Sequence, residues 1–299
     1  MPVPPLRSTI STSDLPRSRR PGGWPRALWY LLIAAWLAGC ASVERLFAPG
    51  AEPWPRWEAY DPESRRTVDH SQWDRFLAAY LVPGSDGINR IAYARVSPDD
   101  REALATYVER LAATPVDRLS RDEQFAYWVN LYNALTVKTV LDHYPVRRIL
   151  DVTLSRAPFA VGPWSAKIVE VDGERLSLDD IEHRILRPIW RDPRIHYAVN
   201  CAALGCPNLQ PRAFTAATRT AMLDAAARAF VNHRRGSRID DGSLAVSRLY
   251  IWYREDFGGS DEGVIAHLRR YAEGPLLGAL ENAPGLVDGG YDWALNAAR

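Results

Sequence analysis

The segment Ser120-Arg-Asp-Glu-Gln-Phe-Ala-Tyr-Trp-Val-Asn-Leu-Tyr-Asn-Ala-Leu-Thr-Val-Lys-Thr-Val-Leu-Asp-His143 is the most informative stretch of the sequence. Ser120 followed three residues later by Glu123 is a capping box, so a helix begins here. The residues from 124 to 140 are apolar almost all round, which predicts a helix covered by protein on every side. Asn130 and Asn133 lie one turn apart within it. A buried amide without partners costs about 1–3 kcal/mol, so both should be hydrogen-bonded to specific groups.

The elements on either side of this helix predict a mixed architecture. Asp-Gly turns at 172–173 and 241–242 lie between alternating residues, as in β-hairpins. Apolar periodicity predicts further elements, namely helices over 71–81, 99–112, 178–186, 215–232 and 263–271 and a strand over 195–200. Because helices and strands are mixed without strict alternation, we predict an α+β fold: a single helix-rich domain with hairpins and antiparallel strands.

Composition limits the class of protein. The chain has 299 residues and is 47% hydrophobic, enough apolar material for a core, so a wholly disordered chain is excluded. With 37 basic and 36 acidic residues, the overall charge gives no support for nucleic-acid binding. No second linker follows Trp57, so residues 57–299 are predicted to be one globular domain.

The N-terminus indicates export. Arg19, Arg20 and Arg26 precede a twelve-residue apolar run over 27–38. As a helix this run would rise about 18 Å, too short for a hydrocarbon core of about 30 Å. The pattern is typical of a signal peptide, and Leu37-Ala38-Gly39-Cys40 resembles a bacterial lipobox. We therefore expect a signal peptide over 1–39, a diacylglyceryl group on Cys40 and a proline-containing tether over 40–56. The protein would be attached to the cell envelope, on the outer membrane facing the periplasm in a Gram-negative cell.

Candidate chemistry begins on the helix over 178–186. Glu182 lies beside its apolar stripe and needs an internal partner. Asp179 and His183 are four residues apart, close enough for the carboxylate to orient the imidazole. A structural salt-bridge network explains the same pattern.

The segment Arg194-Ile-His-Tyr-Ala-Val-Asn-Cys-Ala-Ala-Leu-Gly-Cys-Pro207 offers a histidine and two cysteines. On a strand, His196 and Asn200 would share one face and Cys201 the other, so His196 would not activate the Cys201 thiol directly. In an oxidising compartment Cys201 and Cys206 can form a disulfide with Cα atoms within about 7 Å. A catalytic thiol at Cys201 is the alternative. A zinc site using these cysteines with His183 and His196 lacks the tight cysteine spacing, and we predict no cofactor.

Three long motifs resemble the family called domain of unknown function 547. They are residues 123–134, 177–187 and 194–207, and the pairs at 252–253 and 256–257 with residues 291–296 resemble the family's closing motifs. The resemblance runs from Trp57 to Asn296. It implies one globular domain, often exported or lipid-anchored in bacteria, and it implies no chemistry. The family's characteristic positions correspond here to Asn130, Asn133, Glu182, His183, His196, Asn200, Cys201 and Cys206.

Three functions fit these observations. The first is an envelope hydrolase or acyl-transfer enzyme. Its candidate catalytic residues are His196, Cys201, Glu182, His183 and Asn133, and its supporting polar or structural residues are Asn130, Asn200, Asp179 and Cys206. The second is a non-catalytic module that binds a small molecule or an envelope protein. The third is a thiol redox protein, which the Cys-x4-Cys spacing disfavours. We expect His196, one of the two helix asparagines, and Glu182 or His183 to line one shared polar site.

Overall fold

The computed structural model describes residues 49–154, 161–281 and 285–298. Cys40 and the whole of the expected signal peptide lie outside these residues. The described residues form one compact unit, and its architecture is the α+β mixture expected from the sequence. In the described part of the chain, no helix is both long and apolar enough to cross a bilayer.

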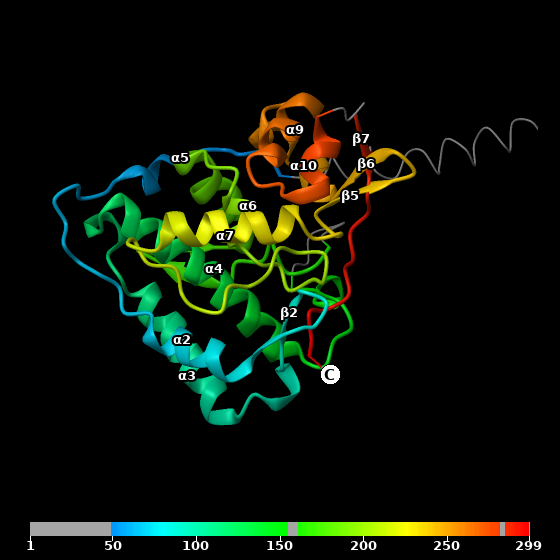
Figure 1. Cartoon of the computed structure of the whole chain (residues 1–299). Helices are drawn as coiled ribbons and strands as arrows, with labels where there is room; N and C mark the ends of the chain where they lie inside the picture. The colour runs from blue at the N-terminus through cyan, green and yellow to red at the C-terminus, as the bar shows by residue number, and fades with distance from the viewer. Residues whose placement is uncertain (1–48, 155–160, 282–284, 299) are drawn as a thin grey trace, which may run out of the picture. The chain divides into compact units, whose positions relative to one another are not determined.

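The first half of the fold is helical. Helix α4 (Arg121–His143) runs through the middle of the neighbouring helices and packs against α3 (Pro98–Ala112), which in turn packs against α2 (Ser71–Tyr80) (Figure 1). Eighteen of the 23 residues of α4 are buried, as its all-round apolar sequence predicts. Ser120 caps the helix, because its hydroxyl accepts a hydrogen bond from the Glu123 N–H. The Glu123 carboxylate accepts from the Val68 N–H instead of from the Ser120 N–H, so a long-range hydrogen bond replaces the second half of the capping box.

The strands form small separate sheets. Strands β1 (Leu81–Pro83) and β2 (Asn89–Ile91) pair antiparallel, as do β3 (Val169–Val171) and β4 (Glu174–Leu176). Strands β5 (Ser237–Asp240), β6 (Ser243–Val246) and β7 (Leu286–Asp288) form a third sheet in which β7 runs parallel to β6. Both predicted hairpins are confirmed. Their turns, Asp172-Gly173 and Asp241-Gly242, have positive φ at both central residues, which Asp and Gly tolerate.

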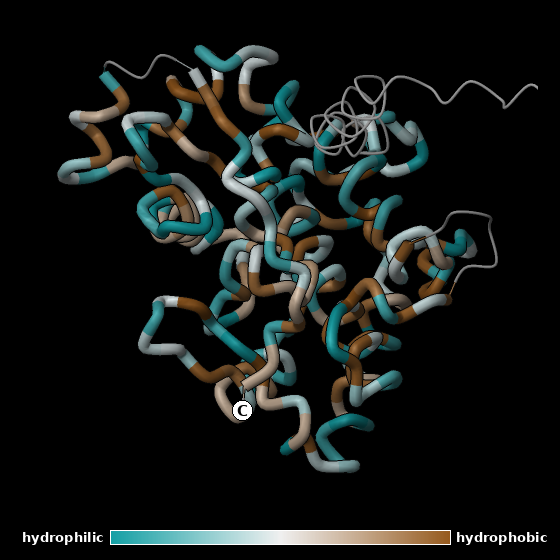
Figure 2. Tube along the Cα trace, turned by 90° about the vertical axis from the view of Figure 1, so that its right-hand side faces the viewer, coloured by the Kyte–Doolittle hydropathy of each residue, from teal (hydrophilic) through white to brown (hydrophobic). Residues whose placement is uncertain are grey.

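The remaining helices are short apart from α7. They are α5 (Arg187–Trp190), α6 (Ile195–Ala198), α7 (Arg219–Val231), α8 (Arg248–Trp252), α9 (Asp261–Arg269) and α10 (Gly274–Leu280). Single 3₁₀ turns occur at η1 (Pro55–Glu58), η2 (Tyr93–Arg95), η3 (Val116–Arg118), η4 (Ile149–Asp151) and η6 (Arg254–Phe257). Figure 2 shows hydrophilic residues on many of the outer turns of the trace and hydrophobic residues along its inner segments.

The strand predicted over 195–200 is wrong. Residues 195–198 form one helical turn, α6, and extended backbone begins only at Val199. A short apolar run fits a buried helical turn as well as a strand. The turn allows Ile195 and Ala198 to join the main core while Tyr197 enters a second core with Phe230 and Tyr250.

The expected tether contacts the domain along its described part. The Glu52 N–H donates to the His183 carbonyl at 3.1 Å, and the Trp54 N–H donates to the Arg184 carbonyl at 3.2 Å. The Arg184 guanidinium lies 4.2 Å from the centre of the Trp54 ring. Residues 52–54 therefore lie along the helix that carries His183.

Candidate functional site

A π-helix, η5 (Asp180–Leu186), positions the acidic and imidazole groups predicted from the sequence. Ser177 caps this helical segment, because its hydroxyl accepts the Asp180 N–H while the Asp180 carboxylate accepts the Ser177 N–H. The N–H of Arg187 bonds to the carbonyl of Glu182, five residues earlier. Such wide turns are uncommon and frequently occur at functional sites. Here the turn buries Glu182, His183 and Arg187 together.

His196 links two carboxylates that are far apart in the sequence. Its Nε2 lies 2.6 Å from Asp256 Oδ2, and its Nδ1 lies 3.5 Å from Glu182 Oε1. Its ring stacks on Tyr253 with centroids 4.4 Å apart. Because both partners are carboxylates that accept hydrogen bonds, they favour the doubly protonated imidazolium form of His196.

The electrostatics of the three groups agree with this assignment. Burial opposes protonation of His196, but the hydrogen bonds to Asp256 and Glu182 outweigh it and raise the pKa of His196. Burial likewise opposes ionisation of Glu182, but His183, His196 and Arg187 lower the pKa of Glu182 to about 2. The pKa of Asp256 is also well below its usual range, despite burial, because it accepts from His196 and Arg187. The buried network is therefore ionic.

Arg187 completes the network and fixes the state of His183. Its Nε donates to Asp256 Oδ2 at 2.6 Å, and its Nη1 donates to the Pro49 carbonyl at 2.7 Å and to His183 Nδ1 at 3.0 Å. Since arginine only donates, His183 Nδ1 is an acceptor, and the proton of the neutral ring is on Nε2. Burial and the Arg187 charge hold the pKa of His183 at about 4.

Asp179 differs from the other members of the site. His183 Nε2 lies 3.8 Å from Asp179 Oδ1, the pairing expected from their spacing. A third of the Asp179 side chain is exposed, whereas the Glu182 side chain is 9% exposed. Burial, followed by repulsion from Glu182 and Asp180, raises the pKa of Asp179 to about 7. Asp179 is therefore a carboxyl group that gains or loses its proton near neutral pH and can be reached by solvent.

The two helix asparagines bind backbone rather than the ionic network. Asn130 donates to the Phe214 carbonyl and accepts from the Phe214 N–H, at 2.8 and 3.0 Å. Asn133 donates to the Ala198 carbonyl and accepts from the Asn200 N–H, at 2.9 and 2.8 Å. Asn133 thus holds the chain just after His196 and supports the site from behind.

Cys201 and Cys206 form a disulfide with Cα atoms 6.2 Å apart, within the expected limit. A free nucleophilic thiol at Cys201 is therefore not what the structure shows. Asn200 closes the loop between the cysteines, donating to the Pro207 carbonyl and accepting from the Ala202 N–H. Among the residues that the structure describes, no group of three or more His, Cys, Asp or Glu side chains is arranged to hold a metal ion.

Several members of the site were not predicted from the sequence. Asp256 and Tyr253 come from the segment around η6, about 60 residues beyond His196, and Tyr132 of α4 shares a hydrogen bond with Glu182. Arg187 had a detectable signal, because it follows His183 by four residues on the same helical segment.

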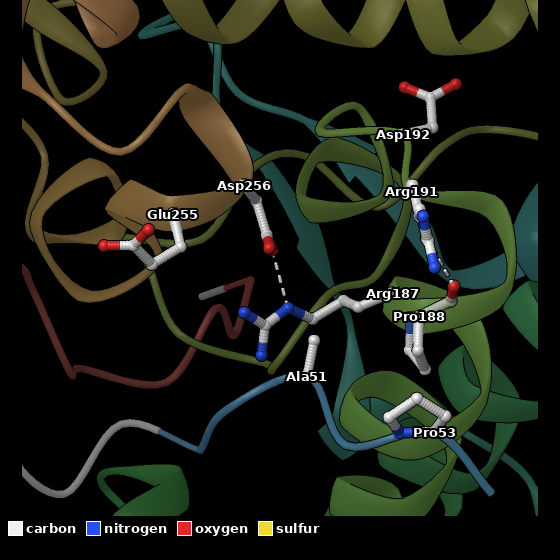
Figure 3. A pocket seen from close by; sticks show the side chains of 8 residues that line it. All are labelled: Ala51, Pro53, Arg187, Pro188, Arg191, Asp192, Glu255 and Asp256. Carbon is white, nitrogen blue, oxygen red and sulfur yellow. Dashed lines mark hydrogen bonds and ion pairs between the residues drawn. The ribbon is translucent and has the colours of Figure 1, made fainter.

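A cavity of about 300 Å³ opens onto this network. Its lining includes Arg187 and Asp256, together with Ala51 and Pro53 of the N-terminal segment. In Figure 3 the Arg187 side chain reaches towards Asp256, and Ala51 and Pro53 lie along the side formed by that segment.

Comparison with known proteins matches part of the chain to a family. No curated protein and no solved structure matches this chain. Residues 116–231 match the family described as "Protein of unknown function, DUF547". This segment contains α4, the π-helix, His196 and the disulfide loop, so the match supports the DUF547 family resemblance over the part of the chain that carries most of the candidate site.

Proposed function

We propose that the protein is a cell-envelope hydrolase in which Asp179 is the general acid. The observation that carries the proposal is the contrast between two carboxyl groups three residues apart. The pKa of Asp179 is raised to about 7, and that of Glu182 is lowered to about 2. Neighbouring acids whose pKa values are driven apart in this way are typical of acid–base catalysis.

The proposed reaction uses the groups that solvent can reach and leaves out those that are held in bonds within the protein. Asp179 would donate its proton to the leaving oxygen or nitrogen of a bound ester, glycoside or amide. Water would attack the electrophilic carbon, and its proton would restore Asp179. The cysteine sulfurs are held in the disulfide, which favours water over a thiolate as nucleophile.

In this proposal the buried groups are positioning residues. His196 and Arg187 together balance the charges of Glu182 and Asp256, so the ionised Glu182 can remain buried beside Asp179. His183 directs its Nε2 towards Asp179 because Arg187 occupies its other nitrogen. Removing any of these groups should shift the pKa of Asp179 rather than remove the acid itself.

Replacing Asp179 with asparagine should lower the hydrolysis rate about 10²–10⁴-fold, the usual contribution of a general acid. Because the acid works protonated, the wild-type rate should fall as pH rises through about 7. This alkaline limb should vanish in Asp179→Asn. The measurement is a pH–rate profile on a panel of fluorogenic esters, amides and glycosides.

Asp117→Asn is the matched control, because Asp117 lies on the exposed turn η3, away from the ionic network. It should leave both the rate and the profile unchanged. An alkaline limb that persists in Asp179→Asn would assign the titrating group elsewhere and contradict the proposal.

A second candidate function, binding of a small charged ligand, is favoured by the cavity. Its lining places Arg187 and Arg191 alongside Asp192 and Asp256, so charges of both signs border the same space. A zwitterionic ligand would match that pattern. A binding module needs no proton from Asp179. If the wild-type protein hydrolyses none of the substrates, and Asp179→Asn binds the ligand as tightly as wild type does, the binding function is favoured over the hydrolase.

We also propose that the protein is lipid-anchored through Cys40, on the evidence of the basic segment, the short apolar run and the Leu-Ala-Gly-Cys motif. Intact-mass analysis of the membrane-extracted protein should find a chain that starts at Cys40 and carries a diacylglyceryl group. Cys40→Ser should release the protein or leave its signal peptide uncleaved. Wild-type protein that is found in the soluble fraction and starts at another residue would contradict this.

A further inference from the structure

The two sulfurs of the disulfide differ in accessibility. Cys206 is 4% exposed, whereas Cys201 is half-buried. A thiolate in solution can therefore reach Cys201 Sγ more readily than Cys206 Sγ. Attack at Cys201 makes Cys206 the leaving group, and the properties of the Cys206 sulfur then control the reaction.

Two donors point at the Cys206 sulfur. The Cys201 N–H donates to Cys206 Sγ at 2.9 Å, and the Tyr291 hydroxyl donates to it at 3.1 Å. Tyr291 is also 3.1 Å from Cys201 Sγ, so its hydroxyl bridges the sulfurs. Burial raises the pKa of Tyr291 well above its ordinary value, so the phenol keeps its proton and remains a donor. Donors to a thiolate stabilise it more than they stabilise a neutral disulfide.

The charges near the loop favour an anion at this place. Arg235 donates to the Leu204 carbonyl within the loop and to Asn208 Oδ1 just beyond it. Its pKa is lowered by burial only to about 10, so it stays cationic at neutral pH. The Glu182 carboxylate opposes an anion near Tyr291, but Glu182 is paired with His196.

The loop keeps its shape through bonds that do not involve sulfur. The Asn200 amide spans the loop from Ala202 to Pro207, and Asn133 fixes the Asn200 N–H. The Leu204 and Gly205 N–H groups donate to the Ala294 and Asp292 carbonyls of the C-terminal segment. Gly205 is needed for this approach, since a Cβ there would lie 2.8 Å from the Asp292 nitrogen. Opening the disulfide should therefore leave the sulfurs close together.

From these contacts we propose a second activity for the protein: Cys201–Cys206 is an exchange-active disulfide that oxidises an external dithiol. A thiolate of the dithiol attacks Cys201 Sγ, the S–S bond breaks, and its electron pair moves to Cys206 Sγ, which accepts from Tyr291 and Cys201. The second thiolate of the substrate attacks the mixed disulfide and releases Cys201. The dithiol loses two electrons and two protons, and the protein gains them as two thiols.

The test uses the full chain carrying Cys40→Ser, so that Cys201 and Cys206 are its remaining cysteines. Equilibration with reduced and oxidised dithiothreitol, followed by acid quenching and thiol labelling, gives the equilibrium constant for reduction. Tyr291→Phe should lower this constant about tenfold or more, since a hydrogen bond to a charged group is lost. Tyr271→Phe, a half-buried tyrosine that bonds to Asp224, should leave it unchanged.

A second measurement does not depend on the tyrosine variant. Reduced glutathione added to the disulfide-bonded protein, followed by acid quenching and peptide mass analysis, should give a mixed disulfide on Cys201 at least about tenfold more often than on Cys206, because Cys201 is the more exposed sulfur and Cys206 is the better leaving group. The reduced wild-type protein should keep its near-ultraviolet circular dichroism. Resistance of the folded protein to dithiothreitol, equal constants for the two tyrosine variants, or a glutathione mixed disulfide found mainly on Cys206 would overturn the proposal.

Discussion

Replacing His196 with alanine should lower the free energy of unfolding by about 3–5 kcal/mol, the usual result of removing one partner from a buried ion pair. His196 is 2% exposed and lies between Glu182 and Asp256. Without the imidazolium, the buried Glu182 carboxylate loses an ionic partner and Asp256 keeps only Arg187 from the described ionic network. The stacking on Tyr253 is lost as well. Urea unfolding of both proteins measures the difference.

The pH dependence of this loss identifies its cause. The raised pKa of His196 contributes stability that is fully present below about pH 6.5 and is lost as pH rises through the folded-state value. The lowered pKa of Glu182 contributes stability that is present above about pH 4.3 and is lost as pH falls towards about 2. The difference between wild type and variant should therefore be largest between these limits.

His143→Ala is the matched control, because His143 is exposed at the end of α4 and bonds only to the Thr139 carbonyl within its own helix. Its effect should stay within about 0.5 kcal/mol, as is usual for surface substitutions. If His196→Ala unfolds like His143→Ala at pH 6, the ionic network does not stabilise the fold, and the positioning role given to His196 above is wrong.

The parts of the fold that depend on local sequence could be predicted. The helices over 71–80, 98–112 and 121–143 and both hairpins follow from apolar period, capping residues and Asp-Gly turns. The strand expected at 195–200 was not found. The secondary structure of this short apolar run depends on its packing in two cores and on a hydrogen bond from Asn133, and these partners lie elsewhere in the sequence. The π-helical path of residues 180–186 likewise has no local sequence signal that distinguishes it from an α-helix.

The site could be predicted only in part, for the same reason. Glu182, His183 and His196 carry a signal because each is a polar group on an apolar element. Asp256 and Tyr253 lie on a short turn whose sequence indicates no burial, and they reach His196 only through the tertiary fold. The asparagines were identified correctly as buried and bonded. Their partners are backbone groups, which a sequence does not reveal.

Replacing Asn133 with alanine should lower the free energy of unfolding by about 2–6 kcal/mol, because two buried backbone groups, the Ala198 carbonyl and the Asn200 N–H, lose their partner and each loss costs about 1–3 kcal/mol. Asn130→Ala should cost a similar amount through the Phe214 N–H and carbonyl. Thermal and urea unfolding measure both.

The two asparagines should nevertheless differ in what else they change. Asn133 holds the chain between His196 and the disulfide loop, whereas Asn130 holds Phe214, beyond that loop. Asn133→Ala should therefore also raise the rate at which Cys201 is labelled in the reduced protein, and Asn130→Ala should not. Thr220→Ala, at an exposed threonine of α7, should change the free energy of unfolding by less than about 1 kcal/mol and leave labelling unchanged. A general loss of stability would raise the labelling rate of Cys201 equally in the Asn130 and Asn133 variants. Equal rates would therefore show that Asn133 stabilises the fold without organising the disulfide loop.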